Sequence, residues 1–391
     1  MKFAAFGLIA LILSAYTSLH AAPTPESKTS PASTTMIDVY TSGKDGYYMY
    51  RIPSIVTAPD GSLLAFAEGR KKSKSDSGDI DMLVKRSTDG GYTWSKQQII
   101  WDDGPNTCGN PCPVVDQTTG TIHLLMTHNP GNYKESKPEA PGVGTRTVWV
   151  TTSNDSGLTW SQPREITSDV KDSSWLWFAT GPGIGIQIKN GPHAGRLLIP
   201  ANYSRPEAIN PSEKWPGRAI GTYAFYSDDH GKTWQSSANT IEPHVNESQL
   251  VELPGGNVMT NMRAYFKDSR RRSAISKDSG TTWSKPRKED ALIEPVCQAS
   301  ILRYSWPSQT EQSILLFANP AHKTKRRHLT FRASFDEGKT WPVSKMIYKG
   351  DTAYSSLIRL PGNNVGCFFE RDGYKTMTLI IVPITELTQS P

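Results

Sequence analysis

The stretch STDGGYTW, residues 87–94, is the first of five copies of one eight-residue pattern in this 391-residue chain. The pattern Ser-x-Asp-x-Gly-x-Thr-Trp fixes five positions, and every copy matches it fully. Five fixed positions that include the rare tryptophan would recur by chance well under once in a chain of this length, so the pattern marks an internal repeat. The other copies are SNDSGLTW at 153–160, SDDHGKTW at 227–234, SKDSGTTW at 276–283 and SFDEGKTW at 334–341.

The composition of each copy predicts a tight turn between two β-strands. The aspartate can accept hydrogen bonds from backbone amides just ahead of it, and the glycine two residues later adopts a positive φ without steric cost. The Thr-Trp pair then re-enters a strand, where we expect the indole to pack over the turn and its N–H to find one acceptor. The aspartates are therefore interpreted as turn-forming residues and not as catalysts: Asp89, Asp155, Asp229, Asp278 and Asp336.

The spacing of the copies, 49 to 74 residues, fits one four-stranded sheet with variable loops. Repeats of this length are typical of a β-propeller, whose radial arrangement protects the sheet edges. No long segment has helical periodicity, whereas short strand-like runs are common. These runs are 62–67, 80–86, 121–127, 146–152, 196–201, 220–227, 314–318 and 377–382. The sequence therefore predicts an all-β fold in which the repeats build scaffold and other residues carry the chemistry.

The N-terminus has the layout of a secretory signal peptide. Lys2 precedes an apolar run at 3–15, and small residues follow at Ala21 and Ala22; the run is too short for a stable membrane span. We expect residues 1–22 to be removed on export and residues 23–36 to form a disordered tether rich in Pro, Ser and Thr. Residues 37–391 then form one large domain without a membrane span, in a secreted or periplasmic protein.

The formal charge is +6, from 43 basic and 37 acidic residues, which permits anionic ligands without specifying one. Basic-aromatic arrays, phosphate-binding glycine loops and zinc-type Cys/His spacings are missing from the sequence, so we expect no nucleic acid partner and no metal or organic cofactor. The basic run at 267–272 is interpreted as a solvated loop.

The chain contains four cysteines. Cys108 and Cys112, within TCGNPCP, either form a local disulfide, which export would permit, or remain thiols. Cys297 and Cys367 lie in apolar runs, which favours buried thiols over reactive ones.

Outside the repeats, several short segments concentrate arginines, carboxylates and one tyrosine. Each of them, taken singly, has an ordinary structural explanation. The segments are YRIP at 50–53, EGR at 68–70, DSGD at 76–79, NESQLVEL at 246–253, TNMR at 260–263, KRRHL at 325–329, AYSSL at 353–357 and GCFFE at 366–370.

Together with the five repeats, these segments resemble the bacterial-type exo-α-sialidases (neuraminidases) over about residues 37–385. The combination is specific, whereas the repeats alone also occur in propellers of other function. The resemblance implies a six-bladed β-propeller of four-stranded antiparallel blades, with the active site at one mouth of the central axis. Because the chain has five repeats, one blade is expected to lack a copy.

In that family three arginines bind the carboxylate of sialic acid, and the matching positions are Arg51, Arg263 and Arg326. A guanidinium stays charged and presents a planar fork of donors that suits bidentate binding of a carboxylate. Arg327 lies beside Arg326 and competes with it for the third position, and His328 stands where the family usually has asparagine.

The resemblance also assigns supporting residues. Glu370 matches the carboxylate that braces the first arginine, and such a carboxylate offsets the mutual repulsion of packed guanidiniums. Arg70 and Glu68 match further positions at the rim, with Arg70 on the side of the substrate carboxylate or the neighbouring hydroxyl.

Three residues match catalytic positions. Tyr354 matches the nucleophile, which in sialidases is a tyrosine instead of the usual carboxylate. A neutral phenol is not repelled by the substrate carboxylate, but it needs a base to take its proton, and Glu247 matches that base. Asp76 matches the general acid/base; Asp79 and Asp81 compete with it on sequence alone.

The aromatic segment at 175–182 matches a stretch near the active-site mouth of the family. Its aromatic side chains contact either the glycerol or N-acetyl side of the substrate or the packed interior of a blade. Both interpretations stay open at the level of the sequence.

The resemblance implies an exported exo-α-sialidase that releases terminal α-linked sialic acids from glycoproteins, glycolipids or oligosaccharides, with retention through a covalent tyrosyl intermediate. We expect a monomer. A trans-sialidase or an anhydro-sialic-acid-forming sialidase would use the same intermediate. A glycan-binding propeller without activity would be expected to lack Tyr354, Glu247 or Asp76. An unrelated propeller with these repeats, such as a glucan-active enzyme or a sorting-receptor domain, would lack the three arginines.

Overall fold

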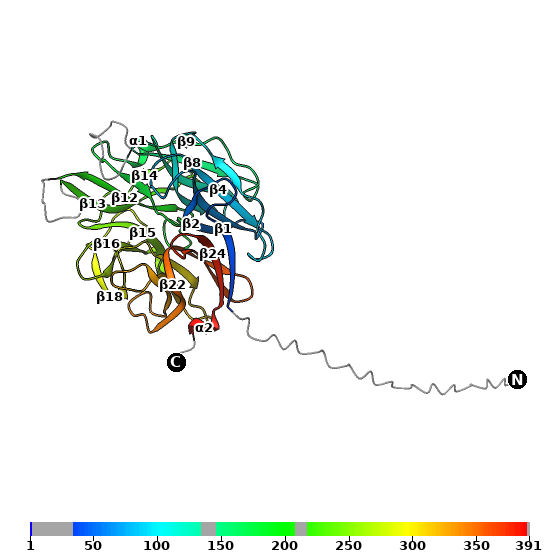
Figure 1. Ribbon diagram of the computed structural model, residues 1–391. Coiled ribbons are helices and arrows are strands. Elements are labelled where there is room, and N and C mark those ends of the chain that lie inside the picture. Colours follow the sequence, from blue (N-terminus) through cyan, green and yellow to red (C-terminus); the bar gives the residue numbers. More distant parts are fainter. Residues whose placement is uncertain (2–33, 134–145, 208–216, 389–391) are drawn as a thin grey trace. The chain divides into compact units, whose positions relative to one another are not determined.

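The structure is a computed structural model that describes residues 1, 34–133, 146–207 and 217–388 (Figure 1). The predicted signal peptide beyond Met1, and the predicted tether up to residue 33, lie outside the described residues. Within the described part, 24 strands contrast with two four-residue helices, α1 (Thr167–Val170) and α2 (Thr385–Thr388), and one 3₁₀ turn (Pro254–Gly256). This content confirms the all-β prediction, and no described helix has the length and apolar character that crossing a membrane requires.

The described strands form four sheets, of eight, five, four and seven strands. Along the chain their antiparallel pairs fall into six groups. The first contains β2 (Met49–Thr57), β3 (Leu63–Arg70), β4 (Ile80–Ser87) and β5 (Gln98–Trp101); the second β6 (Thr107–Val115), β7 (Ile122–Asn129), β8 (Thr147–Ser153) and β9 (Arg164–Glu165); the third β10 (Phe178–Thr180), β11 (Ile186–Gln187), β12 (Leu197–Pro206), β13 (Arg218–Ser227) and β14 (Gln235–Ser236). The fourth contains β15 (Val245–Glu252), β16 (Val258–Ala264), β17 (Arg270–Ser276) and β18 (Arg287–Ile293); the fifth β19 (Ser300–Ser305), β20 (Ile314–Pro320), β21 (Arg327–Ser334) and the start of β22 (Val343–Leu360); the sixth the rest of β22, β23 (Asn364–Arg371), β24 (Thr376–Pro383) and β1 (Thr35–Thr41). The first two groups are joined by a parallel bridge from β4 to β6, and the last two by β22. Each strand-like run of the sequence overlaps one of these strands.

The first strand of the domain completes the last group. β1 pairs with β24 from Thr35, opposite Ile381, to Thr41, opposite Thr376 (Figure 1). Strand β1 thus begins two residues before the predicted domain boundary at residue 37, so Thr35 and Met36 are strand residues and not part of the predicted tether. Their backbone groups join the ladder of β24, which the composition of the preceding segment did not reveal.

The five repeats form the turns that the sequence predicts, each between the last two strands of its group. In every copy the serine hydroxyl donates to the aspartate (2.7–2.8 Å), and the threonine amide donates to the same carboxylate (2.8–2.9 Å). The glycine amide donates to the serine hydroxyl, and the five glycines have φ between 77° and 98°. The sixth group, which begins with the second part of β22, lacks a copy of the repeat.

The indoles of the repeats depart from the expectation that each N–H finds one acceptor. Trp94 donates to the carbonyl of Gly91 at 3.0 Å, but the other four indole nitrogens are buried without a hydrogen-bond partner among the described residues: Trp160, Trp234, Trp283 and Trp341. Their rings pack against apolar and aromatic side chains of a neighbouring group, as Trp160 does edge-on to Phe66. Apolar burial therefore outweighs the polar contact at these positions.

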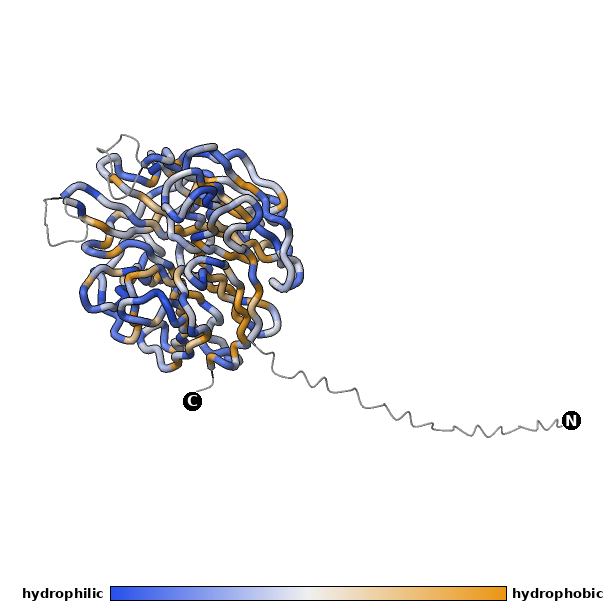
Figure 2. The backbone as a smooth tube through the Cα atoms, in the orientation of Figure 1, coloured by the Kyte–Doolittle hydropathy of each residue, from blue (hydrophilic) through white to orange (hydrophobic). Residues whose placement is uncertain are grey.

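Apolar side chains lie between successive groups. Figure 2 shows the apolar stretches inside the body and the polar stretches along its periphery. Phe66 of the first group shares a cluster with Leu124 of the second, and Phe368 of the sixth group shares one with Leu63 of the first. Four further clusters join the remaining neighbours in chain order. The inner strands also touch, since β2 contacts β6 and β22, and β15 contacts β12 and β19.

Two sequence interpretations concern charged and sulfur side chains. The basic run at 267–272 is not the predicted solvated loop, because its last three residues open β17 and Arg271 is fully buried against Glu294 at 2.9 Å. All four cysteines are buried free thiols. Cys108 and Cys112 lie opposite His128 and Leu125 in β7 and form no disulfide.

Candidate active site

A cavity of about 250 Å³ collects side chains from segments far apart in the sequence. Of the nine residues that the resemblance singled out, eight line it, and the ninth, Glu370, lies directly behind Arg51. The eight are Arg51, Glu68, Arg70, Asp76, Glu247, Arg263, Arg326 and Tyr354. The structure therefore brings all nine together, while their roles remain predictions.

Three of these residues lie at irregularities in the first strand of a group. The register shifts between Arg51 and Ser54 in β2, between Val245 and Ser248 in β15, and between Thr352 and Ser355 in β22. Such a bulge adds an unpaired residue and turns a side chain out of the regular alternation. Glu247 and Tyr354 lie inside two of these bulges, and Arg51 lies at the edge of the third.

The sequence around Arg51 explains its bulge. Pro53 has no amide hydrogen to give to the ladder, and Ile52 adopts a positive φ of 61°, which is rare for a β-branched residue. The strained turn releases the Ile52 amide from the ladder, and this amide donates to Oε1 of Glu370 at 2.9 Å. The guanidinium of Arg51 then faces the cavity.

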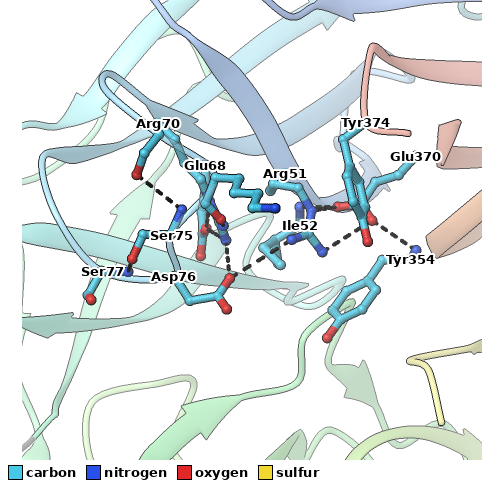
Figure 3. A network of polar contacts seen from close by, with 12 residues as sticks. Arg51, Ile52, Glu68, Arg70, Ser75, Asp76, Ser77, Tyr354, Glu370 and Tyr374 are labelled. Atoms are coloured by element: carbon cyan, nitrogen blue, oxygen red, sulfur yellow. Dashed lines mark hydrogen bonds and ion pairs between the residues drawn. The ribbon is translucent and has the colours of Figure 1, made fainter. Parts of the chain in front are cut away.

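Glu370 is a completely buried carboxylate with both oxygens in use (Figure 3). Arg51 donates through Nε to Oε1 at 2.6 Å and through Nη2 to Oε2 at 3.3 Å. The amide of Tyr354 donates to Oε2 at 3.0 Å. Burial alone would lower the pKa of Arg51, but the Glu370 charge raises it well above its usual value. One carboxylate thus fixes an arginine and the main chain of the tyrosine together.

Tyr354 points its hydroxyl at two charged groups. It donates to Oε1 of Glu247 in a short hydrogen bond and accepts from Nη1 of Arg263 at 3.1 Å. The same Nη1 donates to Oε2 of Glu247 at 2.6 Å. Burial, and next the charge of Glu247, raise the pKa of Tyr354 well above 10, although Arg263 and Arg326 oppose the shift. The phenol is therefore neutral, with a carboxylate already in place to receive its proton.

The structure shows that Arg326, and not the adjacent Arg327, lies at the cavity. Arg326 lines the cavity, and its guanidinium carbon lies 5.5 Å from the centre of the Tyr354 ring. Its Nη1 donates to the hydroxyl of Tyr374 at 3.2 Å and its Nη2 to the carbonyl of Val296 at 3.4 Å. Arg327 opens β21 and lies outside the cavity lining.

Asp76 lies on the opposite side, on the loop between β3 and β4, with its side chain 68% exposed. Its Oδ1 lies 2.8 Å from Nη2 of Arg70 and 3.9 Å from Nη1 of Arg51 (Figure 3). Glu68 is buried behind Arg70, which donates to it at 2.6 and 3.0 Å, so Glu68 supports the rim from inside. Lost hydration would raise the pKa of Asp76, but the charges of Arg70 and Arg51 hold it below its usual value.

The two aspartates that compete with Asp76 on sequence alone point elsewhere. Asp79 and Asp81 each lie 3.1 Å from Nζ of Lys71, and neither lines the cavity. Asp81 also accepts a hydrogen bond from the hydroxyl of Tyr47. These contacts tie the base of the loop to the sheet and leave Asp76 as the carboxylate of this loop at the cavity.

The sequence reasoning gave no role to several lining residues, although Asn246 begins one of the segments it singled out: Asn110, Arg146, Asn202, Asn246 and Tyr265. Arg146 donates to Asn110 at 2.5 Å and lies 3.9 Å from the Trp177 ring. Single polar residues in or beside strands carry no local pattern, so the sequence offers no signal for their place at the cavity. The aromatic segment at 175–182 contributes both to the cavity and to the packed interior. Trp177 lines the cavity, whereas Trp175 stacks on Tyr203 in the core with ring centres 3.9 Å apart.

Within the part of the chain that the structure describes, no three His, Cys, Asp or Glu side chains gather in a way that could hold a metal ion. The cavity instead combines arginines, carboxylates and one buried tyrosine. Such a set can bind an anion, deprotonate a phenol and deliver a proton.

Comparison with known proteins adds independent information. The family model of the BNR repeat-like domain matches residues 61–367. A protein of Micromonospora viridifaciens described as a sialidase is 36% identical over 348 residues, which cover 85% of this chain and 51% of that protein. The chain thus spans about half the length of this relative.

Solved structures agree with this result. The Hadza microbial sialidase Hz136 superposes with a TM-score of 0.78 at 31% identity, over 90% of this chain and 69% of that one. A leech intramolecular trans-sialidase superposes with a TM-score of 0.77 at 20% identity, over 91% of this chain and 71% of that one. The second likeness concerns the fold alone.

Proposed function

This chain belongs to the sialidases, and from that membership we propose that it is an exo-α-sialidase that hydrolyses terminal α-linked sialic acids. Its substrates would be sialylated glycoproteins, glycolipids or oligosaccharides. The observation that carries the proposal is the hydrogen bond from the Tyr354 hydroxyl to Glu247, inside a cavity that also holds Arg51, Arg263 and Arg326. A buried tyrosine paired with a base beside an anion site is the arrangement that a tyrosine nucleophile requires.

The three arginines would bind the carboxylate on the anomeric carbon and so set the face presented to Tyr354. Bidentate guanidinium–carboxylate contacts fix orientation as well as charge, and correct orientation supplies much of the rate enhancement of a displacement reaction. The nucleophile is a neutral phenol, so the substrate carboxylate does not repel it. As the bond from Tyr354 to the anomeric carbon forms, Glu247 takes the phenolic proton.

Asp76 would protonate the leaving oxygen and later take a proton from the attacking water. The charges of Arg70 and Arg51 lower the pKa of Asp76, so it is a carboxylate before substrate binds. A bound substrate carboxylate would offset the charge of Arg51 and raise the pKa of Asp76. Binding would therefore favour the protonated form that the first step needs, and two displacements would give net retention.

We propose water as the acceptor of the glycosyl group. The Asp76 side chain is 68% exposed, so a water molecule can approach the group that would activate it. The alternatives with the same intermediate, transfer to a sugar or closure to an anhydro product, differ in product and are separated by product analysis.

The remaining proposals concern architecture and location. The contacts between inner strands and the apolar clusters between successive groups support a closed six-bladed propeller of four-stranded blades. The composition of residues 1–22 supports export to the medium or the periplasm, and we propose a monomer.

The proposal is tested with residues 23–391 and an aryl α-sialoside. The unmutated protein should release the phenol, and NMR spectra should show α-sialic acid as the first product formed. Tyr354→Phe should lose turnover by orders of magnitude while keeping its circular dichroism spectrum and its affinity for sialic acid. Tyr304→Phe, which alters a buried tyrosine of β19 outside the cavity lining, is the matched control. Binding of sialic acid without release by the unmutated protein would identify a glycan-binding propeller instead.

A further inference from the structure

We propose that Tyr374 is a positioning residue that orients two of the three arginines for the substrate carboxylate; the inference rests on the function proposed above. Tyr374 is not part of the cavity lining. It contacts Arg51 with its ring and Arg326 with its hydroxyl. No sequence motif pointed to it.

The backbone at Tyr374 is held in an unfavourable conformation. The residue lies in the turn between β23 and β24, and it follows Asp372 and Gly373 in a run of three positive φ angles, 54°, 65° and 69°. For a bulky aromatic residue such a φ is an outlier, and outliers persist where the surroundings fix them. The Tyr374 carbonyl accepts from the hydroxyl of Ser42 at 2.7 Å, which ties the turn to the end of β1.

The side chain lies behind the arginines as seen from the cavity. The guanidinium carbon of Arg51 is 4.2 Å from the centre of the Tyr374 ring (Figure 3), a cation–π distance. The Tyr374 hydroxyl accepts from Nη1 of Arg326 at 3.2 Å. On its other side Tyr374 borders a separate cavity of about 340 Å³ that it shares with Lys325, Asp351 and Arg326. Arg326 lines both cavities, and Tyr374 holds its guanidinium from the side of the second one.

The charges explain why a tyrosine suits this position. Arg51 is paired with Glu370 and Arg263 with Glu247. Across the described residues, no carboxylate comes within ion-pair distance of Arg326, whose two hydrogen bonds go to the neutral oxygens of Tyr374 and Val296. A phenol orients a guanidinium without neutralising it, so Arg326 keeps its charge for an anionic ligand. A carboxylate in place of Tyr374 would compete with the substrate.

The substitution Tyr374→Phe keeps the ring against Arg51 and removes the acceptor for Arg326. A hydrogen bond to a charged group contributes enough that we expect KM for a sialoside to rise about 10-fold, with kcat changed less than about 2-fold. Tyr374→Leu removes both contacts and should raise KM further. The matched control is Tyr348→Phe, which removes the hydroxyl that binds Asp372 in the same turn but touches none of the three arginines.

The experiment measures kcat and KM with an aryl α-sialoside, and the Kd of free sialic acid and of its methyl ester by calorimetry. We expect Tyr374→Phe to bind free sialic acid more weakly than the unmutated protein does. The methyl ester should bind equally to the unmutated protein and to Tyr374→Phe. Tyr348→Phe should keep the kcat, KM and Kd of the unmutated protein. Unchanged KM and Kd in Tyr374→Phe, or equal losses in Tyr348→Phe, would overturn the inference. Absence of turnover by the unmutated protein would refute the proposed function, while the affinity for sialic acid would still decide the role of Tyr374.

Discussion

The two sides of the cavity differ in how firmly their reacting groups are held. Tyr354 lies in β22, is 6% exposed, and is bound through its amide to Glu370 and through its hydroxyl to Glu247. Asp76 lies on a loop, is 68% exposed, and contacts the cavity through Arg70 and, at 3.9 Å, Arg51. The side that holds the proposed nucleophile is built into the sheets, and the side that holds the proposed proton donor is attached to them at few points.

This difference fits the role proposed for each side. An anion site and a nucleophile gain from fixed geometry, since misplacement by a fraction of an ångström lowers the rate. A general acid that later serves as a base must change its charge within one turnover, and it needs access to water. We therefore expect substitutions on the first side to affect stability and activity together, and substitutions on the second side to affect activity alone.

The largest effect is expected for Glu370→Ala. The change leaves the guanidinium of Arg51 buried without its carboxylate, and breaking a buried ion pair typically costs about 3–5 kcal/mol of unfolding free energy. Turnover should fall with it, because the amide of Tyr354 and the Arg51 side chain lose the same partner. Denaturant unfolding and turnover measured on the same samples test this. Glu370→Gln, which keeps the volume and one acceptor, should lose less of both, and an unchanged unfolding free energy in the alanine variant would contradict the idea that this side is built into the fold.

A smaller and purely kinetic effect is expected for Asp76→Asn. Loss of a general acid lowers kcat by about 10²- to 10⁴-fold, whereas an exposed side chain on a loop should change the unfolding free energy by less than about 0.5 kcal/mol. The loss should be greatest for an oligosaccharide leaving group and least for an acidic phenol, which needs no proton. Asp79→Asn is the control, because that carboxylate binds Lys71. An equal loss of kcat for the two leaving groups would contradict the proposal that Asp76 is the general acid.

Local patterns were sufficient to predict the all-β class and the turns between strands. The repeats predicted the five turns, because serine, aspartate, glycine and threonine interact within eight residues. The site could not be predicted in this way. Arg51 and Glu370 are separated by 319 residues, so no spacing rule predicts that they are in contact. That prediction came from the resemblance to a family. The same reasoning missed Tyr374, whose contacts depend on a turn with positive φ angles, and it misjudged Arg271, whose partner Glu294 lies in another segment.

The smallest effect is expected in the repeats, where Asp278→Ala should lower the unfolding free energy by about 1 kcal/mol at neutral pH without changing kcat/KM. Asp278 accepts from the hydroxyl of Thr282 at 2.6 Å, from the amide of Thr282 at 2.8 Å and from the hydroxyl of Ser276 at 2.7 Å. Burial would raise its pKa, but these hydrogen bonds lower it overall. A carboxyl whose pKa is lowered by folding stabilises the protein above its unfolded pKa, and that contribution disappears as the pH falls through the folded pKa. The difference between the unmutated protein and the variant, measured by urea unfolding, should therefore shrink below about pH 4. The control is Asp290→Ala, which removes an exposed carboxylate beside Lys288. It should show neither the loss of unfolding free energy nor its pH dependence. A fall in kcat/KM for Asp278→Ala would mean that the repeat turns also position the cavity.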